Sequence, residues 1–215
     1  KRVFGSEVSL QEFLASLHVD NILVSSVNTP GEKILSWVRN GTRKFFLTPV
    51  LPLPVKNLYK TPETLGVDRI AGVCGAWQLF PFQSSLVIDA GTCITYDFID
   101  EKGSYHGGGI SPGLHMRFKA MNTFTARLPL ISPALHPPLV GDSTETSMQT
   151  GVVNGVVSEM EGIISRYLEK FPRLKVILCG GDTDFFEKQV KASIFASPEL
   201  VLVGLNSILI YNVSL

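Results

Sequence analysis

The stretch from Leu86 to Asp97 constrains the fold of this chain more than any other part of its sequence. Its three leading apolar residues predict a buried strand, and a second strand, which alternates apolar with polar residues, runs on to Phe98. Asp89, Gly91 and Thr92 place a carboxylate, a residue without a Cβ and a hydroxyl on one tight turn between these strands. Such a turn suits a phosphate with its accompanying cation, and an ordinary hairpin is the alternative.

The composition limits the classes of protein to which the chain can belong. Its 215 residues allow one large domain or two small ones, and a hydrophobic share of 45% is that of a globular chain. Lys plus Arg equals Asp plus Glu at 19 each, so the overall charge does not favour nucleic acid. No apolar run approaches the roughly 18 residues of a membrane span. We therefore expect neither a nucleic-acid nor a membrane partner.

The three cysteines, Cys74, Cys93 and Cys179, are widely spaced and lie in apolar surroundings. An odd and unpatterned set is typical of a reducing compartment, which predicts a cytoplasmic protein whose cysteines pack as small apolar residues. The four histidines show no spacing typical of metal ligands, so we expect no zinc site.

Helices and strands alternate along the chain, which predicts an α/β layer arrangement. In the first 50 residues, apolar spacing predicts helices over 10–18 and 31–40 and strands over 21–26 and 44–47. Four prolines between residues 48 and 63 exclude a helix there. The expected elements of the remaining chain are a helix over 68–80, the two strands around the Asp89 turn, a strand over 104–110 that Gly107–Gly109 end, a helix over 114–124, a long helix ending near Phe171, a strand over 176–178, a helix over 185–191, a last strand over 201–203 and a closing helix over 204–211.

Asp68 and Arg69 begin the helix that follows the proline-rich segment. An acid in the first turn suits the helix dipole, but a guanidinium does not, so we expect Arg69 to have a partner. One interpretation is a capping Asp68 beside a solvated Arg69. The other is a general base beside a guanidinium that binds an anion.

Three further segments carry weaker signals. Tyr59 lies in a loop, where a tyrosine usually packs on the surface. Thr144 falls in the first turn of the long helix, for which Asp142 and Glu145 suggest a capping box. Cys179-Gly180-Gly181 follows a strand and precedes a helix, which is typical of nucleotide sites and also of ordinary connections.

Together these segments resemble the type III pantothenate kinases, also called the Bvg accessory factor family. The resemblance covers about residues 40 to 215. Six segments match the family's motifs in their order: Gly66-Val67-Asp68-Arg69, Asp89-Ala90-Gly91-Thr92, Gly107 to Gly113, Arg127-Leu128-Pro129-Leu130, Gly141 to Glu145 and Cys179-Gly180-Gly181.

The resemblance implies a two-lobed, actin-like (ribonuclease H-like) α/β ATPase fold of the acetate kinase, hexokinase and actin superfamily. We expect a first lobe over 1–83 and a second over 84–215, with a cleft between them. The resemblance also implies a homodimer whose site is completed across the interface. The implied reaction transfers the γ-phosphoryl group of ATP, supplied with Mg²⁺, to the hydroxyl of pantothenate, and so opens coenzyme A synthesis.

The resemblance also implies a role for each matching residue. Asp68 would be the general base that takes the hydroxyl proton. Asp89 would bind the monovalent cation that the family uses, K⁺ or NH₄⁺, and Thr92 would contact an ATP phosphate. The residues implied to bind pantothenate are Tyr59, Gly66, Val67, Asp68, Arg69 and Thr144. These parts suffice in principle, because phosphoryl transfer depends on positioning and charge neutralisation more than on covalent chemistry.

One departure from the family concerns the beginning of the chain. The family opens with an Asp-x-Gly-Asn-Thr hairpin that binds phosphate, and nothing before residue 40 matches it. The chain starts on Lys1 rather than Met, and Lys1–Gly5 resembles the end of a strand. We therefore expect that an N-terminal segment is missing and that the first lobe lacks its first hairpin.

Two other classes of function compete with a pantothenate kinase. One is a regulatory or scaffold protein that kept the fold without catalysis, although the sequence shows no helix-turn-helix pattern for direct DNA binding. The other is a different enzyme of the superfamily, such as a sugar kinase or a polyphosphate hydrolase. The Gly66–Arg69 motif and Tyr59 favour pantothenate.

Overall fold

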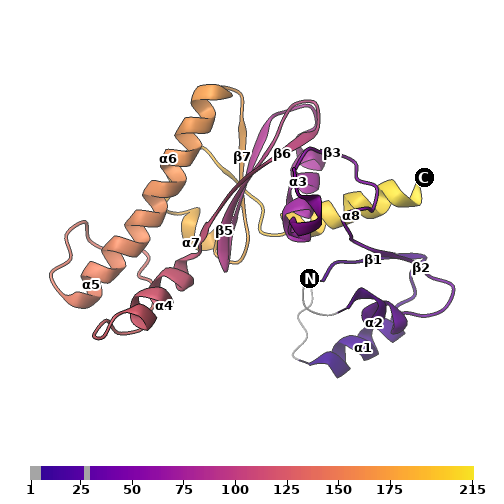
Figure 1. Ribbon diagram of the computed structural model, residues 1–215, viewed down its shortest axis with the longest axis horizontal. Coiled ribbons are helices and arrows are strands. Elements are labelled where there is room, and N and C mark those ends of the chain that lie inside the picture. The colour runs from indigo at the N-terminus through magenta and orange to yellow at the C-terminus, as the bar shows by residue number, and fades with distance from the viewer. Residues whose placement is uncertain (1–5, 27–29) are drawn as a thin grey trace.

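The N-terminal part of the chain forms a small α/β unit. The structure is a computed structural model that describes residues 6–26 and 30–215 (Figure 1). The unit consists of α1 (Glu7–Ser16), β1 (Asn21–Val24), α2 (Gly31–Ser36) and β2 (Arg43–Phe46), and β1 pairs with β2 in parallel. The expected alternation of helix and strand is confirmed, with α2 ending four residues earlier than expected. The expectation for Lys1–Gly5 lies outside the described residues.

A six-stranded sheet organises the rest of the chain. Its strands are β3 (Lys56–Asn57), β4 (Ser85–Ala90), β5 (Cys93–Ile99), β6 (Ser104–Pro112), β7 (Lys175–Cys179) and β8 (Phe195–Ala196), in the order β3-β6-β5-β4-β7-β8. β5 runs antiparallel to both of its neighbours, and the other pairs in this sheet are parallel. Leu86, Val87 and Ile88 are at most 2% exposed, because helices cover both faces of β4.

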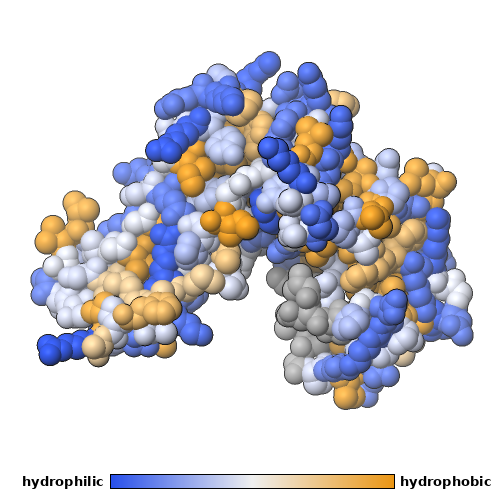
Figure 2. Space-filling view, in the orientation of Figure 1, coloured by the Kyte–Doolittle hydropathy of each residue, from blue (hydrophilic) through white to orange (hydrophobic). Residues whose placement is uncertain are grey.

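Helices pack on the two faces of this sheet as separate layers. The helices α4 (Leu114–Phe124), α5 (Thr144–Gln149) and α6 (Gly155–Lys170) lie on the face of Ile88 and Tyr96. The helices α3 (Val67–Leu79) and α8 (Leu200–Val213) lie on the opposite face, with Val87 and Ile177. Figure 2 shows a concave surface between the arm that carries α4 to α6 and the arm that carries α1 and α2. No described helix is long and apolar enough to cross a membrane.

Two expectations about strands are wrong. The glycine run does not end its strand, because β6 continues to Pro112. Gly108 instead lets β6 approach β5, since a Cβ there would lie 1.5 Å from the carbonyl oxygen of Tyr96. Residues 201–203 are not a strand but part of α8, which packs on α3 and β1 through one face and carries further apolar residues, such as Leu202 and Ile210, on its exposed side. A strand that the sequence did not indicate, β8, precedes it.

The long helix also begins and continues differently from expectation. Its N-cap is Ser143, whose hydroxyl accepts a hydrogen bond from the Thr146 N–H, while the Thr146 hydroxyl completes the capping box. Asp142 instead accepts a hydrogen bond from the Thr146 hydroxyl at 3.1 Å. A π-helical segment, Thr150–Asn154, joins α5 to α6. The helix expected over 185–191 is the shorter and earlier α7 (Thr183–Phe186).

The proline-rich segment joins the two parts of the chain without an α-helix. It contains β3 and a 3₁₀ turn, Pro62–Thr64, and leads into α3. Because β3 pairs with β6 and α3 packs on β4 and β5, residues from 56 onward are attached to the six-stranded sheet. The division of the chain at residue 83 stays a prediction.

Candidate active site

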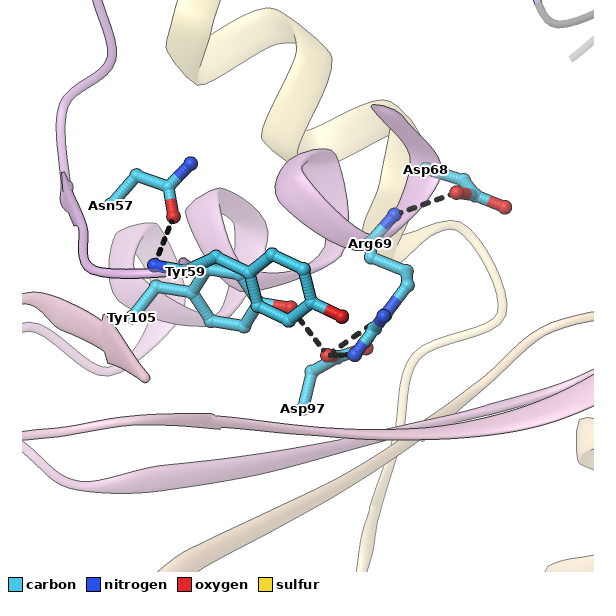
Figure 3. A network of polar contacts seen from close by, with 6 residues as sticks. All are labelled: Asn57, Tyr59, Asp68, Arg69, Asp97 and Tyr105. Carbon is cyan, nitrogen blue, oxygen red and sulfur yellow. Dashed lines mark hydrogen bonds and ion pairs between the residues drawn. The ribbon is translucent and has the colours of Figure 1, made fainter. Parts of the chain in front are cut away.

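A buried ion pair joins the start of α3 to the middle of β5. Arg69 donates from Nε to both carboxylate oxygens of Asp97, at 3.0 and 3.1 Å, and from Nη2 to Oδ1 at 2.6 Å (Figure 3). The two side chains are 7% and 1% exposed. Arg69 therefore has the partner that its place in the first helical turn requires, and the alternative of a solvated Arg69 is wrong.

Tyr105 of β6 completes this buried group. Its hydroxyl donates to Asp97 Oδ1 at 2.7 Å. Burial raises the pKa of the Tyr105 hydroxyl, and the negative charge of Asp97 raises it further. Burial by itself lowers the pKa of Arg69, but its hydrogen bonds and charge interaction with Asp97 outweigh burial and raise that pKa above its ordinary value. The tyrosine is therefore held as a neutral donor and the guanidinium as a cation.

Tyr59 lies against the same group and is fixed by short local contacts. Its backbone N–H donates to Asn57 Oδ1 at 3.0 Å, and the preceding N–H donates to the carbonyl oxygen of Tyr105 at 2.9 Å. The rings of Tyr59 and Tyr105 stack with an interplanar angle of 9° and centroids 6.1 Å apart. The guanidinium carbon of Arg69 lies 5.5 Å from the Tyr59 ring centroid. Gly107 leaves room for this ring, because a Cβ there would lie 2.8 Å from it and the backbone has φ +94°.

Asp68 occupies the first turn of α3, on the other side of Arg69 from the two tyrosines (Figure 3). Its Oδ1 accepts a hydrogen bond from the Arg69 backbone N–H at 2.9 Å. A Cβ at Gly66 would lie 2.5 Å from that oxygen, so the glycine admits the carboxylate in this position.

The turn from Asp89 to Thr92 joins β4 to β5, as expected. Asp89 is directly opposite Thr95 on β5, and Asp97 lies two residues further along the same face. Burial raises the pKa of Asp89 to about 6, and the charges of Asp68 and Asp97 contribute to the shift. The structure thus brings three carboxylates within electrostatic reach of one another, with Arg69 paired to one of them.

The Asp89 turn offers oxygen atoms to a cation. Thr95 Oγ1 is buried and has no hydrogen-bond partner among the described residues. Buried hydroxyls are normally paired, so an unpaired oxygen opposite the half-buried carboxylate of Asp89 fits a hard cation, which prefers oxygen ligands. Within the described ranges, no group of three or more His, Cys, Asp or Glu side chains could hold a metal ion.

The Cys179-Gly180-Gly181 motif borders a hollow beside the Asp89 turn. The hollow has a volume of about 760 Å³ and is lined by Gly180, Gly181 and residues of α7 and α8. Gly180, with φ +95°, passes so close to Ala90 that a Cβ would lie 2.3 Å from the Ala90 carbonyl oxygen. The Asp182 N–H donates to that same oxygen at 2.9 Å. The Asp89–Thr92 motif and the Cys179-Gly180-Gly181 motif therefore lie next to each other.

The predicted site residues do not all lie together. The group around Arg69 contains Tyr59, Gly66, Val67 and Asp68, and the Asp89 turn with Thr92 lies on the neighbouring strands. Thr144 begins α5, which lies at the far side of the structure from α3 (Figure 1). Within one chain, the structure does not bring Thr144 to Asp68.

Sequence reasoning missed Asp97, Tyr105, Asn57 and Thr95. The signal for Asp97 was present, since it lies in a strand with apolar residues on both sides, and a buried charge requires a partner. Nothing in the local sequence around Tyr105 indicates its hydrogen bond, because the bond depends on the pairing of β5 with β6.

Comparison with known proteins identifies the family. The chain is an α/β protein that carries Asp89 and Asp97 on one face of two central strands, and residues 5–166 match the family model of type III pantothenate kinase. It is 55% identical over 161 residues to the type III pantothenate kinase of Phocaeicola vulgatus, covering 75% of this chain and 66% of that protein. It is 45% identical over 193 residues to that of Cytophaga hutchinsonii, covering 90% and 81% of the two chains. The chain belongs to the type III pantothenate kinase family.

A solved structure shares the fold. The chain resembles a conserved putative Baf family transcriptional activator from Campylobacter jejuni with a TM-score of 0.60 and 22% identity, over 95% of this chain and 89% of that one. The predicted α/β fold class is confirmed, and the two-lobed actin-like assignment stays a prediction. The chain spans about two thirds of the length of the Phocaeicola relative.

Proposed function

We propose that this protein is a pantothenate kinase, which transfers the γ-phosphoryl group of ATP to the hydroxyl of pantothenate in the first step of coenzyme A synthesis. Membership of the family supports the activity. The observation that carries the proposal is the carboxylate of Asp68 at the N-terminus of α3, beside a buried Arg69 and close to the Asp89 turn.

Asp68 acts as the general base for the pantothenate hydroxyl. Its carboxylate is exposed, and its one described hydrogen bond, from the Arg69 N–H, occupies a single oxygen. The second oxygen can take the proton of a hydroxyl placed at hydrogen-bond distance. Arg69, Tyr59 and the backbone of Gly66 and Val67 surround the place where pantothenate binds.

The Asp89 turn serves the phosphates. Asp89 and Thr95 hold a monovalent cation, K⁺ or NH₄⁺, and Thr92, which is exposed, contacts an ATP phosphate. The cation, with the Mg²⁺ that accompanies ATP, supplies positive charge where the transferred group carries negative charge. The hollow beside Gly180 and Gly181 lies next to this turn and is large enough for part of a nucleotide.

The active form is a homodimer in which Thr144 of one chain completes the site of the other. The distance of α5 from α3 within one chain supports this arrangement. Exposed apolar side chains near Thr144 supply a surface that a second copy would cover, and they are Phe124, Leu130, Leu139 and Val140. The cysteines are free, which supports a cytoplasmic location.

Replacement of the proposed base tests this function. Protein expressed from its complete reading frame should phosphorylate pantothenate with Mg-ATP and K⁺. Asp68→Asn should lower turnover by about 10²- to 10⁴-fold, the usual contribution of a general base, without changing the unfolding midpoint. Asp20→Asn, an exposed residue just before β1 in the N-terminal unit, is the matched control. Full turnover in Asp68→Asn would refute the base, and an inactive wild-type protein that still folds would favour a regulatory or scaffold role.

A further inference from the structure

We propose that Asp97 and Tyr105 are positioning residues that hold Arg69 and Tyr59 in place for the acceptor substrate. The inference rests on the proposed function, because it concerns the site to which pantothenate binds. Neither residue belongs to a motif by which the family was identified from the sequence.

A contribution to stability does not by itself explain why Arg69, Asp97 and Tyr105 are buried together. An ion pair as buried as Arg69–Asp97 loses much of its attraction to the cost of removing two charges from water, and apolar residues of similar volume often stabilise a protein as well. The carboxylate nevertheless accepts from Nε, Nη2 and the Tyr105 hydroxyl, all within 3.1 Å. Such complete pairing fixes the orientation of the guanidinium rather than adding a large net stabilisation.

The orientation determines which part of Arg69 is available. Because Nε and Nη2 face Asp97, Nη1 lies outside the ion pair, and the guanidinium is set over the Tyr59 ring. A planar guanidinium held along one edge presents its other atoms in a single direction. Without Asp97, the Arg69 guanidinium would be free to rotate away from the acceptor site beside the first turn of α3.

The same carboxylate also fixes Tyr59 through Tyr105. The Tyr105 hydroxyl is held by Asp97, its ring stacks on Tyr59, and its carbonyl oxygen accepts from the backbone of the Tyr59 loop. Tyr59 therefore depends on a ring whose position Asp97 determines. One buried group thus fixes both side chains that would contact the acceptor, before any substrate binds.

A matched pair of variants separates positioning from general stabilisation. Asp97→Asn keeps the shape of the side chain and removes its charge. Glu159→Gln does the same to a carboxylate that binds Arg117 at 2.6 Å and Tyr96 at 2.9 Å on the opposite face of the sheet. Tyr105→Phe removes only one hydroxyl and keeps the ring that stacks on Tyr59.

The test is the split of the kinetic constants, measured in the full-length protein with unfolding midpoints recorded alongside. Asp97→Asn should raise the KM for pantothenate by about tenfold or more, with the KM for ATP within about twofold. Tyr105→Phe should raise the KM for pantothenate by about threefold, and Glu159→Gln should leave it unchanged.

The outcomes distinguish the inference from the proposed function. If the wild-type protein phosphorylates pantothenate and the KM for pantothenate is unchanged in Asp97→Asn, or rises equally in Glu159→Gln, the positioning role is wrong and the function stands. If Asp97→Asn does not fold, an unchanged KM in Tyr105→Phe refutes the role. If the wild-type protein does not phosphorylate pantothenate, both proposals fail.

Discussion

The two faces of the central sheet carry the same three chemical groups in different surroundings. On the α3 face, Asp97 binds Arg69 and Tyr105. On the opposite face, Glu159 of α6 binds Arg117 of α4 and Tyr96 of β5. The members of the first ion pair are 7% and 1% exposed, whereas those of the second are 22% and 25% exposed.

Because of this difference in burial, the two ion pairs have different effects on the protein. The Arg117–Glu159 pair connects two helices where water can still replace a lost partner, so it acts as an ordinary part-exposed ion pair. The Arg69–Asp97 pair has no such replacement, and it lies beside two further carboxylates, Asp68 and Asp89. The same chemistry therefore serves packing on one face and a charged site on the other.

The largest expected effect is on stability. Asp97→Ala leaves the Arg69 guanidinium buried without its counterion and should lower the free energy of unfolding by about 3–5 kcal/mol. Glu159→Ala should cost about 1–2 kcal/mol, because water can reach Arg117. Urea unfolding of both variants at neutral pH measures the two costs. Equal costs, or the reverse order, would contradict the distinction between the faces.

The next effect concerns the excess of negative charge on the α3 face. Since the pKa of Asp89 is raised to about 6, the folded protein binds this proton more tightly than the unfolded chain, and stability falls as the pH rises from about 4 to about 6. The Asp89→Asn variant should not lose stability over this pH range, because its amide does not titrate. At pH 8, without K⁺, it should therefore be more stable than the wild-type protein by about 1–3 kcal/mol.

Urea unfolding from pH 4 to pH 8 in choline chloride measures the difference, and addition of KCl at pH 8 tests the cation. K⁺ should stabilise the wild-type protein and leave Asp89→Asn unchanged. Parallel pH profiles for the two proteins would show that the charge of Asp89 does not destabilise the folded protein. An equal response to KCl would place the cation elsewhere.

The smallest effect belongs to the opposite face. Burial by itself raises the pKa of Glu159, but hydrogen bonds from Arg117, Ser111 and Tyr96 outweigh burial and lower it. The stability that this group contributes is present above the ordinary pKa of Glu and is lost as the pH falls through the lowered value. After screening by solvent it amounts to less than about 1 kcal/mol. Glu159→Gln should flatten the acid side of the stability profile measured by urea unfolding, and an unchanged profile would show that Glu159 makes no such contribution.

Much of the fold was predictable from local pattern. The hairpin around Asp89, the helices α3 and α4 and the alternation of the first four elements follow from apolar spacing and from turn residues. The prediction of a strand over 201–203 was wrong because α8 carries apolar residues on its exposed side as well as its buried side, so the run of Val and Leu hides the helical stripe. The cap of α5 was also misassigned by one residue, since Asp142 and Ser143 are both suitable caps.

The candidate site was predicted only in part. Its motifs placed Asp68, Asp89 and Gly180 on elements that the sheet brings close together. The sequence indicated that Arg69 needs a partner but not which one, since Asp97 lies 28 residues further along the chain. Thr95 and Tyr105 gave no local signal that distinguishes them from ordinary strand residues.

The sequence by itself determined the elements, the turn chemistry at Asp89 and the motifs that identify the family, because these depend on residues near one another in the chain. The tertiary structure decided that Asp97 and Tyr105 hold Arg69 and Tyr59, and that Thr144 lies apart from them. The physical reason is that a buried charge takes its partner from whichever strand or helix packs against it. Which surfaces pack together is settled by the register of β5 with β4 and β6 and by the packing of α3 on that sheet.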